Sequence, residues 1–280
     1  MLTISKLKRW SINYYIDTAT TAERASADLQ RANGGGLGGS TTPNTRPGPR
    51  SGCWPGGMPG GRRTLTGGLS DAQRAGGEAD AVVVARWLDD GVGPNGARGR
   101  AWVRAGVHGF DLTFCAPKSV SLIRALRADD VVQKATADAH TAALSESMEY
   151  LAAHVGYTRV HNPVTGEKDL MRLPGGLVAI AYQHETSRCG GDPHLHAHVI
   201  VPNRQARADG VLVSIDGTSL YHEARAAGVL YQATLRRELH RSLGDRVGAG
   251  GSRHRDGRGR RVDRDSITAW SRRSSQLREW

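Results

Sequence analysis

The sequence feature that most constrains the fold is a strand–turn–strand pattern between residues 177 and 201. Residues 177–184 and 195–201 are rich in apolar and β-branched side chains, as is typical of strands. A Gly-Gly-Asp-Pro sequence lies between them, and such residues mark turns. The turn can fold the second strand back on the first, so we expect an antiparallel pair.

Three histidines of this pair are expected on one face of the sheet. His196 and His198 are two residues apart, which points both imidazoles to the same side of a strand. The first strand ends at His184, which the turn brings beside them. Three neutral imidazoles can hold a divalent cation and leave coordination positions open for a substrate. The alternative is three unrelated histidines on a polar face, and His194 is a substitute ligand or a turn residue that contacts phosphate.

The remaining pattern predicts a single α/β domain over residues 1–280. Further strands are expected at residues 106–115, 157–161, 170–173 and 211–215, and helices at 18–31, 79–88, 119–127, 129–155 and 221–243. The two longest helices, 129–155 and 221–243, are expected to back an antiparallel sheet of about five strands.

Two segments do not fit this pattern. Residues 34–68 are dense in Gly and Pro, and cannot bury enough apolar surface to offset their ordering entropy. We expect an irregular or disordered insertion there and an irregular segment at 246–264. One hypothesis is that residues 36–67 and 246–262 are read out of frame between compensating insertions and deletions; a genuine basic insertion is the alternative. Sequencing the locus distinguishes the two.

The chain is strongly basic, with a formal charge of +11 and a pI near 10.1. This balance indicates a polyanionic partner, nucleic acid first, although an arginine bias also follows from a GC-rich coding sequence. Three widely spaced cysteines make a disulfide framework unexpected, which suits a reducing cytoplasm. Apolar runs are too short to span a membrane.

A nucleophile is needed if a metal at the histidines is to activate a phosphate. Tyr14 and Tyr15 are the candidates, and water is the alternative. A phenol has a pKa of about 10, so it needs a metal or a base nearby to attack at neutral pH. The other interpretation of this pair is simple packing under the first helix.

Three motifs, in the same order along the chain, resemble those of the MobF (TrwC-type) conjugative relaxases of the HUH endonuclease class. The first is the Met-Leu-Thr-Ile opening with Asn13-Tyr14-Tyr15. The second is the Asp-Leu-Thr-Phe-Cys-Ala-Pro-Lys-Ser-Val-Ser segment at 111–121. The third is His184 with Thr-Ser-Arg, followed by Asp-Pro-His-Leu-His-Ala-His at 192–198.

The resemblance implies a palm-like antiparallel sheet and a specific activity. The enzyme would nick one DNA strand at the transfer origin of a plasmid or integrative element through a 5′-phosphotyrosyl intermediate, and later rejoin it. It implies Mg²⁺ or Mn²⁺, with Zn²⁺ possible, at the three histidines. Single-stranded or supercoiled origin DNA would be the partner, along with relaxosome accessory proteins and a coupling protein.

Several further residues receive roles from the resemblance or from their position. Asp111 would orient a metal-bound histidine or take the tyrosine proton. Lys118 and Ser119 open a helix whose free N–H groups can hold a phosphate, unless this is an ordinary N-cap. Arg188 and Arg204 flank the histidine strand and could clamp phosphates, with solvated loop arginines as the alternative.

The chain departs from the family pattern in three ways. His184 and His196 are twelve positions apart, one more than expected, and we expect Gly190 and Gly191 to absorb the extra residue in the turn. The second family tyrosine is missing after Tyr15. The sequence also lacks a Walker A motif, so no helicase domain is expected.

Three functions therefore compete. The first is an active relaxase domain. The second is a truncated or decayed relaxase that binds origin DNA without efficient cleavage. The third is a metal-dependent hydrolase of a small phosphorylated substrate, which the basic charge and the tyrosines disfavour.

Overall fold

The computed structural model describes residues 2–9, 15, 51–54, 81–94, 96–102, 106–126, 130–173, 177–187, 192–244 and 267, with the backbone alone at 51–54. The helix predicted at 18–31 and the irregular segment predicted at 246–264 lie outside these residues. The same holds for the insertion predicted at 34–68, apart from one strand.

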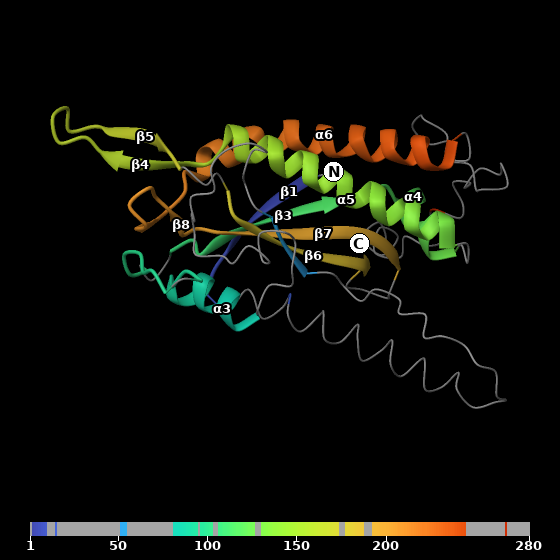
Figure 1. The fold of residues 1–280 in the computed structure, drawn as a ribbon, viewed down its shortest axis with the longest axis horizontal. Coiled ribbons are helices and arrows are strands. Elements are labelled where there is room, and N and C mark those ends of the chain that lie inside the picture. The colour runs from blue at the N-terminus through green and yellow to red at the C-terminus, as the bar shows by residue number, and fades with distance from the viewer. Residues whose placement is uncertain are drawn as a thin grey trace, which may run out of the picture.

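A five-stranded antiparallel sheet lies at the centre of the fold, as the sequence predicts (Figure 1). Its strands, in spatial order, are β1 (Leu2–Leu7), β3 (Gly109–Cys115), β7 (Pro193–Pro202), β6 (Ala179–Thr186) and β2 (Ser51–Trp54). The predicted strand–turn–strand pattern forms the β6–β7 pair, so the interpretation as an antiparallel pair is confirmed.

β2 corrects the expectation that residues 34–68 are irregular throughout. Ser51–Trp54 pairs antiparallel with β6, with Cys53 opposite Ile180. Without β2, the outer edge of β6 would present unpaired N–H and C=O groups, and such an edge accepts a further strand through backbone hydrogen bonds. Composition therefore did not reveal this strand.

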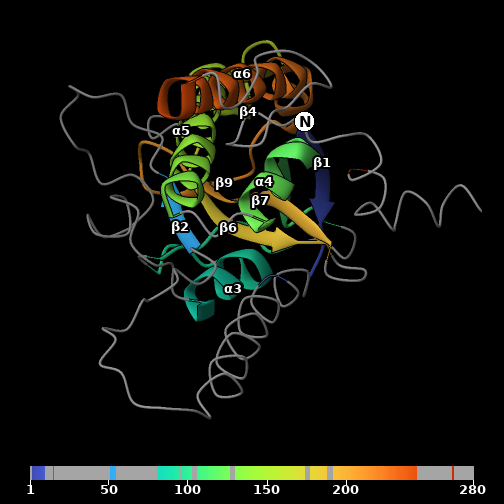
Figure 2. The same cartoon turned by 90° about the vertical axis from the view of Figure 1, so that its right-hand side faces the viewer.

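Helices cover both faces of the sheet (Figures 1 and 2). The long helices α5 (Asp130–His154) and α6 (Gly217–Leu243) pack against each other over one face. The short helix α3 (Ala81–Asp90) lies on the opposite face, and α4 (Lys118–Leu126) packs beside β7 and the start of α5. The helices predicted at 79–88, 119–127, 129–155 and 221–243 are thus confirmed.

Two small hairpins complete the described fold. β4 (Tyr157–His161) and β5 (Lys168–Arg172) correspond to the strands predicted at 157–161 and 170–173, and they form a hairpin that extends from the body at the left of Figure 1. The strand predicted at 211–215 is shorter, β9 (Leu212–Val213), and pairs with β8 (Gln205–Ala206).

α6 begins four residues earlier than the predicted residue 221. Asp216 caps the helix, because its Oδ2 accepts a hydrogen bond from the Ser219 backbone N–H at 3.1 Å. An Asp just before the first helical residue is a helix-start signal that apolar spacing alone does not reveal.

Strand alternation gives the sheet two different faces. Leu112, Phe114, Ala197 and Val199 belong to the main core under α5 and α6. Their neighbours along β3 and β7 point to the α3 side, where a second cluster contains Tyr15, Tyr182 and Ile200. The predicted metal-binding histidines share this second face.

The described helices do not include one that is both long enough and apolar enough to cross a bilayer.

Candidate active site

The three predicted histidines come together on adjacent strands. His184 on β6 lies directly opposite His196 on β7, and all three side chains are buried. One ring nitrogen from each of His184, His196 and His198 can be chosen so that the three lie within 4.8 Å of one another. Each pair of ring centroids is 5.1 Å apart. This convergence would allow the three imidazoles to hold a metal ion.

An irregularity in the β6–β7 ladder sets the face on which these histidines lie. Thr186 pairs with Pro193, whereas His184 pairs with His196, so two residues of β7 oppose the single residue Glu185. Had the first register continued, Leu195 would oppose His184, and His196 would turn into the α5–α6 core. β7 therefore carries a one-residue bulge at His194 and Leu195. Gly190 and Gly191, which we expect to absorb the residue added relative to the family spacing, lie outside the described residues.

Hydrogen bonds orient two of the imidazoles. Nδ1 of His196 is 2.8 Å from the carbonyl oxygen of His194, and Nδ1 of His198 is 2.9 Å from Oδ2 of Asp111. Both partners only accept, so each Nδ1 carries a proton and each Nε2 keeps its lone pair for a ligand. Burial lowers the pKa of His196 to about 3, which keeps this ring neutral at physiological pH.

The Asp111 carboxylate connects the histidines to a tyrosine. The Tyr15 hydroxyl donates a hydrogen bond of 2.7 Å to Oδ2 of Asp111, and the Tyr15 ring lies 5.0 Å from that of His198. The Thr113 hydroxyl donates to the other oxygen, Oδ1, at 3.2 Å. Tyr15 and Asp111 are both buried, at 4% exposure. The structure thus brings Tyr15, Asp111 and the histidines together, while Tyr14 lies outside the described residues.

Tyr182 is a residue of this site that sequence reasoning missed. It lies opposite His198 in the ladder, and its ring stacks on that of Tyr15 at 6.0 Å. The available signal was its spacing, since Tyr182 is two residues before His184 and therefore on the same face. The rings of Tyr182 and His198 thus both lie against the Tyr15 ring.

The residues predicted to contact phosphate near the histidine strand have different surroundings in the structure. Lys118 donates a hydrogen bond of 2.8 Å to the carbonyl oxygen of Pro193, and burial lowers its pKa. Ser119, next to it, is buried, and Arg188 lies outside the described residues. Lys118 therefore secures the start of the histidine strand.

Arg204 lies at the far end of β7 and does not reach the histidines. Its guanidinium stacks 4.0 Å above the Trp102 ring and donates to the Arg100 carbonyl oxygen and the Ser214 hydroxyl. The side chain is buried between these partners. These contacts give Arg204 a packing role, and its predicted contact to phosphate stays a prediction.

His194, the substitute ligand, stays outside the converging trio of nitrogens. Its ring stacks on His196 at 4.7 Å, and its carbonyl oxygen orients that imidazole. Its contribution to the site is therefore through the backbone.

Comparisons with known proteins agree with this architecture. The TrwC relaxase family matches residues 52–280 of this chain. Two multifunctional conjugation proteins TraI, from Escherichia coli and its K12 strain, are 36% and 33% identical over 139 residues, which cover 47% of this chain and 7% of each relative.

Solved structures of the relaxase TrwC show the same fold. The metal-bound complex of TrwC with oriT DNA is 26% identical, with a TM-score of 0.67, and the match covers 100% of this chain and 82% of that one. A complex of TrwC with mutant oriT DNA is 25% identical, with a TM-score of 0.65 and the same coverage. Since the family match spans most of the sequence, the chain belongs to the TrwC relaxase family, which confirms the resemblance. It spans only a small part of the TraI proteins.

Proposed function

We propose that this protein cuts one DNA strand at a transfer origin through a phosphotyrosyl intermediate, rejoins it later, and so initiates conjugative DNA transfer. The observation that carries the proposal is the shared carboxylate of Asp111, which accepts from the Tyr15 hydroxyl and from the His198 imidazole. A nucleophile, its proton acceptor and a candidate metal ligand are thereby held in one hydrogen-bonded unit. The complexes of the relative TrwC with oriT DNA support the choice of substrate.

The bond changes follow from this arrangement. The Tyr15 Oη attacks the scissile phosphorus, and its proton passes to Asp111 as the O–P bond forms. The bond to the 3′ oxygen breaks and this oxygen takes up a proton from water, which leaves a free 3′-hydroxyl on one DNA fragment and a 5′-phosphotyrosyl bond on the other. Attack of a 3′-hydroxyl on the same phosphorus reverses the step and releases the tyrosine.

His184, His196 and His198 are proposed to hold a divalent cation, Mg²⁺ or Mn²⁺ first and Zn²⁺ as an alternative. When bound, such an ion polarises a phosphate oxygen and spreads the charge of the phosphoryl-transfer transition state. A metal-bound structure of TrwC supports this assignment. The His196 imidazole, which is neutral and oriented as described above, needs no proton loss before binding.

The setting proposed for this activity is the cytoplasm, with relaxosome accessory proteins and a coupling protein as partners. Arg188, which is two residues beyond the end of β6 in the sequence, is proposed to contact a DNA phosphate.

Covalent capture of DNA tests the proposal. Labelled single-stranded oligonucleotides from the neighbouring DNA are incubated with the full chain and Mg²⁺, and adducts are resolved on a denaturing gel. We expect Tyr15→Phe to abolish the adduct and preserve DNA binding, while the matched variant Tyr14→Phe keeps it. His196→Ala should slow the reaction and alter its metal dependence.

The outcomes separate the competing functions. DNA binding without an adduct in the unmodified chain would identify a relaxase that binds without cleaving. Turnover of a phosphorylated substrate without an adduct would identify a hydrolase. An adduct that persists in the Tyr14→Phe/Tyr15→Phe double variant would point to another nucleophile and refute this mechanism.

A further inference from the structure

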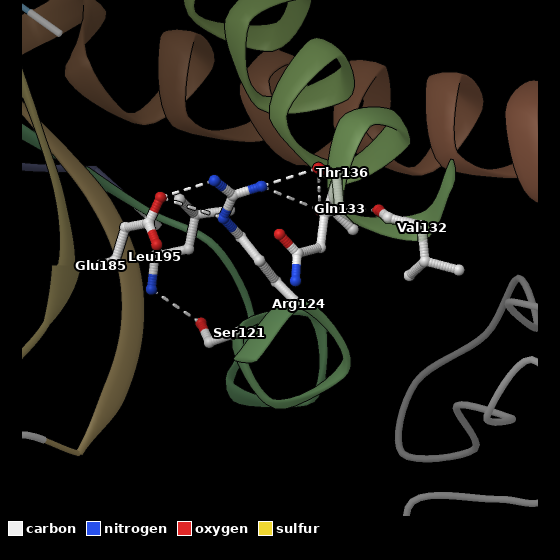
Figure 3. Close-up of polar contacts among 7 residues, drawn as sticks. All are labelled: Ser121, Arg124, Val132, Gln133, Thr136, Glu185 and Leu195. Atoms are coloured by element: carbon white, nitrogen blue, oxygen red, sulfur yellow. Dashed lines mark hydrogen bonds and ion pairs between the residues drawn. The ribbon is translucent and has the colours of Figure 1, made fainter. Parts of the chain in front are cut away.

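Arg124 forms a polar bridge behind the histidine site, on the opposite side of the sheet (Figure 3). Its Nε and Nη2 contact Oε1 of Glu185 at 3.2 and 2.5 Å. Its Nη1 donates to the Gln133 carbonyl oxygen at 2.7 Å and reaches the Thr136 hydroxyl at 3.4 Å. The Arg124 side chain is only 12% exposed. One edge of its guanidinium contacts the start of α5, and the other edge contacts Glu185 on β6.

The residue that Arg124 holds is the one opposite the bulge. Glu185 lies between His184 and Thr186, where the register of β6 and β7 shifts. Regular ladder pairing does not continue through such a position, so the local strand geometry needs support from elsewhere. Glu185 and His184 are consecutive in the strand and point to opposite faces, so a constraint on one side chain fixes the backbone that presents the other.

Helix α4, which carries Arg124, also contacts the β7 side of the bulge. The buried Leu195 N–H donates to the Ser121 hydroxyl oxygen at 2.9 Å, and the Leu195 carbonyl oxygen accepts from the Ala116 N–H at 3.0 Å. Ser121 and Arg124 are three residues apart on α4 and so share one face of the helix. One helix face therefore contacts both strands at the bulge (Figure 3).

We propose that Arg124 is a positioning residue for the three-histidine site, acting through Glu185 to keep the bulge in the register that turns His184 and His196 toward each other. The inference rests on the proposed function in so far as the histidines bind a metal. It adds to that function a second layer of residues on the α5 side of the sheet, remote from Tyr15 and Asp111.

Co²⁺ binding to the full chain, followed by the visible absorption of the bound ion, tests the proposal because it reports both affinity and coordination geometry. Loss of an outer residue that orients ligands weakens metal affinity by about 10–100-fold. Since Arg124 acts through a partly exposed partner, we expect Arg124→Met and Glu185→Gln each to weaken Co²⁺ binding by about tenfold and to change the spectrum. The double variant should bind no more weakly than either single variant, because both substitutions remove the same contact.

Arg237→Met is the matched control. It breaks the Arg237–Glu146 ion pair between α6 and α5, whose N–O distance is 2.8 Å, far from the histidine face. Its Co²⁺ affinity and spectrum should equal those of the unmodified chain, even if its melting temperature falls. Arg124→Lys keeps the charge without the two-pronged contact, and should recover only part of the affinity.

The result that would overturn the proposal is unchanged Co²⁺ affinity and an unchanged spectrum in both Arg124→Met and Glu185→Gln. Additive losses in the double variant would also overturn it, because they would show that the two residues act separately. Failure of the unmodified chain to bind Co²⁺ would instead refute the metal site itself. Glu185→Gln alters a side chain that is 53% exposed, so it keeps the test open if Arg124→Met folds poorly.

Discussion

Replacement of Asp111 by asparagine tests the central hydrogen-bonded unit. The carboxylate accepts from Tyr15 Oη at 2.7 Å on Oδ2, and Nδ1 of His198 lies 3.0 and 2.9 Å from its two oxygens. An amide keeps the shape but offers one acceptor oxygen, and its NH₂ group can only donate. Asp111→Asn therefore removes one of these two hydrogen bonds and the negative charge behind the other.

The size of the effect follows from these contacts. A hydrogen bond to a charged group contributes about 1.5–3 kcal/mol, and every 1.4 kcal/mol is about tenfold in an equilibrium constant. We therefore expect Asp111→Asn to weaken metal binding by about 10–100-fold, the range typical of partners that orient a ligating histidine. Loss of the proton acceptor should slow adduct formation by about 10²–10⁴-fold.

Two assays measure these quantities separately. Calorimetric titration with Mn²⁺ gives the affinity, and single-turnover adduct formation at saturating Mn²⁺ gives the rate. Thr113→Val is the matched control, because it removes the 3.2 Å contacts of the Thr113 hydroxyl to Oδ1 of Asp111 and to Nδ1 of His198 but leaves the carboxylate in place. An Asp111→Asn protein that folds, binds Mn²⁺ within twofold of the unmodified chain and forms adduct at the same rate would refute the reasoning.

Three further predictions concern stability and DNA binding. Burial lowers the pKa of His140 to about 3, whereas the unfolded chain takes up a proton at this histidine near pH 6.5. The contribution of neutral His140 to the free energy of unfolding is therefore complete above pH 6.5, and it is lost at about 1.4 kcal/mol per pH unit as pH falls from 6.5 toward 3. Urea unfolding at pH 7.5 and 5.5 should show a smaller pH dependence in His140→Gln, and an equal one would contradict the assignment. Gly109→Ala places a Cβ 2.7 Å from Leu88 Cδ2 and 2.9 Å from the Val201 carbonyl oxygen, and should cost about 1–3 kcal/mol in the free energy of unfolding measured with urea. Single-stranded DNA affinity should fall steeply with salt, by about 0.7 in the log–log slope per phosphate contact, and a flat response would show that the +11 charge does not serve binding.

Simple periodicity was sufficient to predict the face of the sheet on which the three histidines lie. Strand alternation placed His196 and His198 together, and the position of His184 at the end of its strand placed it beside them. The long helices followed from apolar residues at helical spacing, as in α5 and α6. Strand alternation and helical spacing both depend on residues close together in the sequence, and the structure confirms the strands and helices that they predict within the described residues.

The features that the sequence did not reveal depend on contacts between distant segments. The bulge at Leu195 needs Ser121, which is 74 positions away, and the burial of Arg204 depends on Trp102 and Arg100. β2 joins the sheet through backbone pairing, which leaves no side-chain pattern to read. Alternation along one strand carries no information about such partners.

The bulge in β7 also has a consequence for recognising related sites from sequence alone. The bulge between His184 and the later pair shifts the register by one residue and still leaves all three imidazoles on one face, so the spacing after the first histidine can differ by one. An added residue between His196 and His198 has no such remedy, since it would turn one imidazole toward the apolar layer beneath α5 and α6. A search pattern for sites of this kind should therefore allow variable spacing after the first histidine and keep the His-x-His spacing fixed.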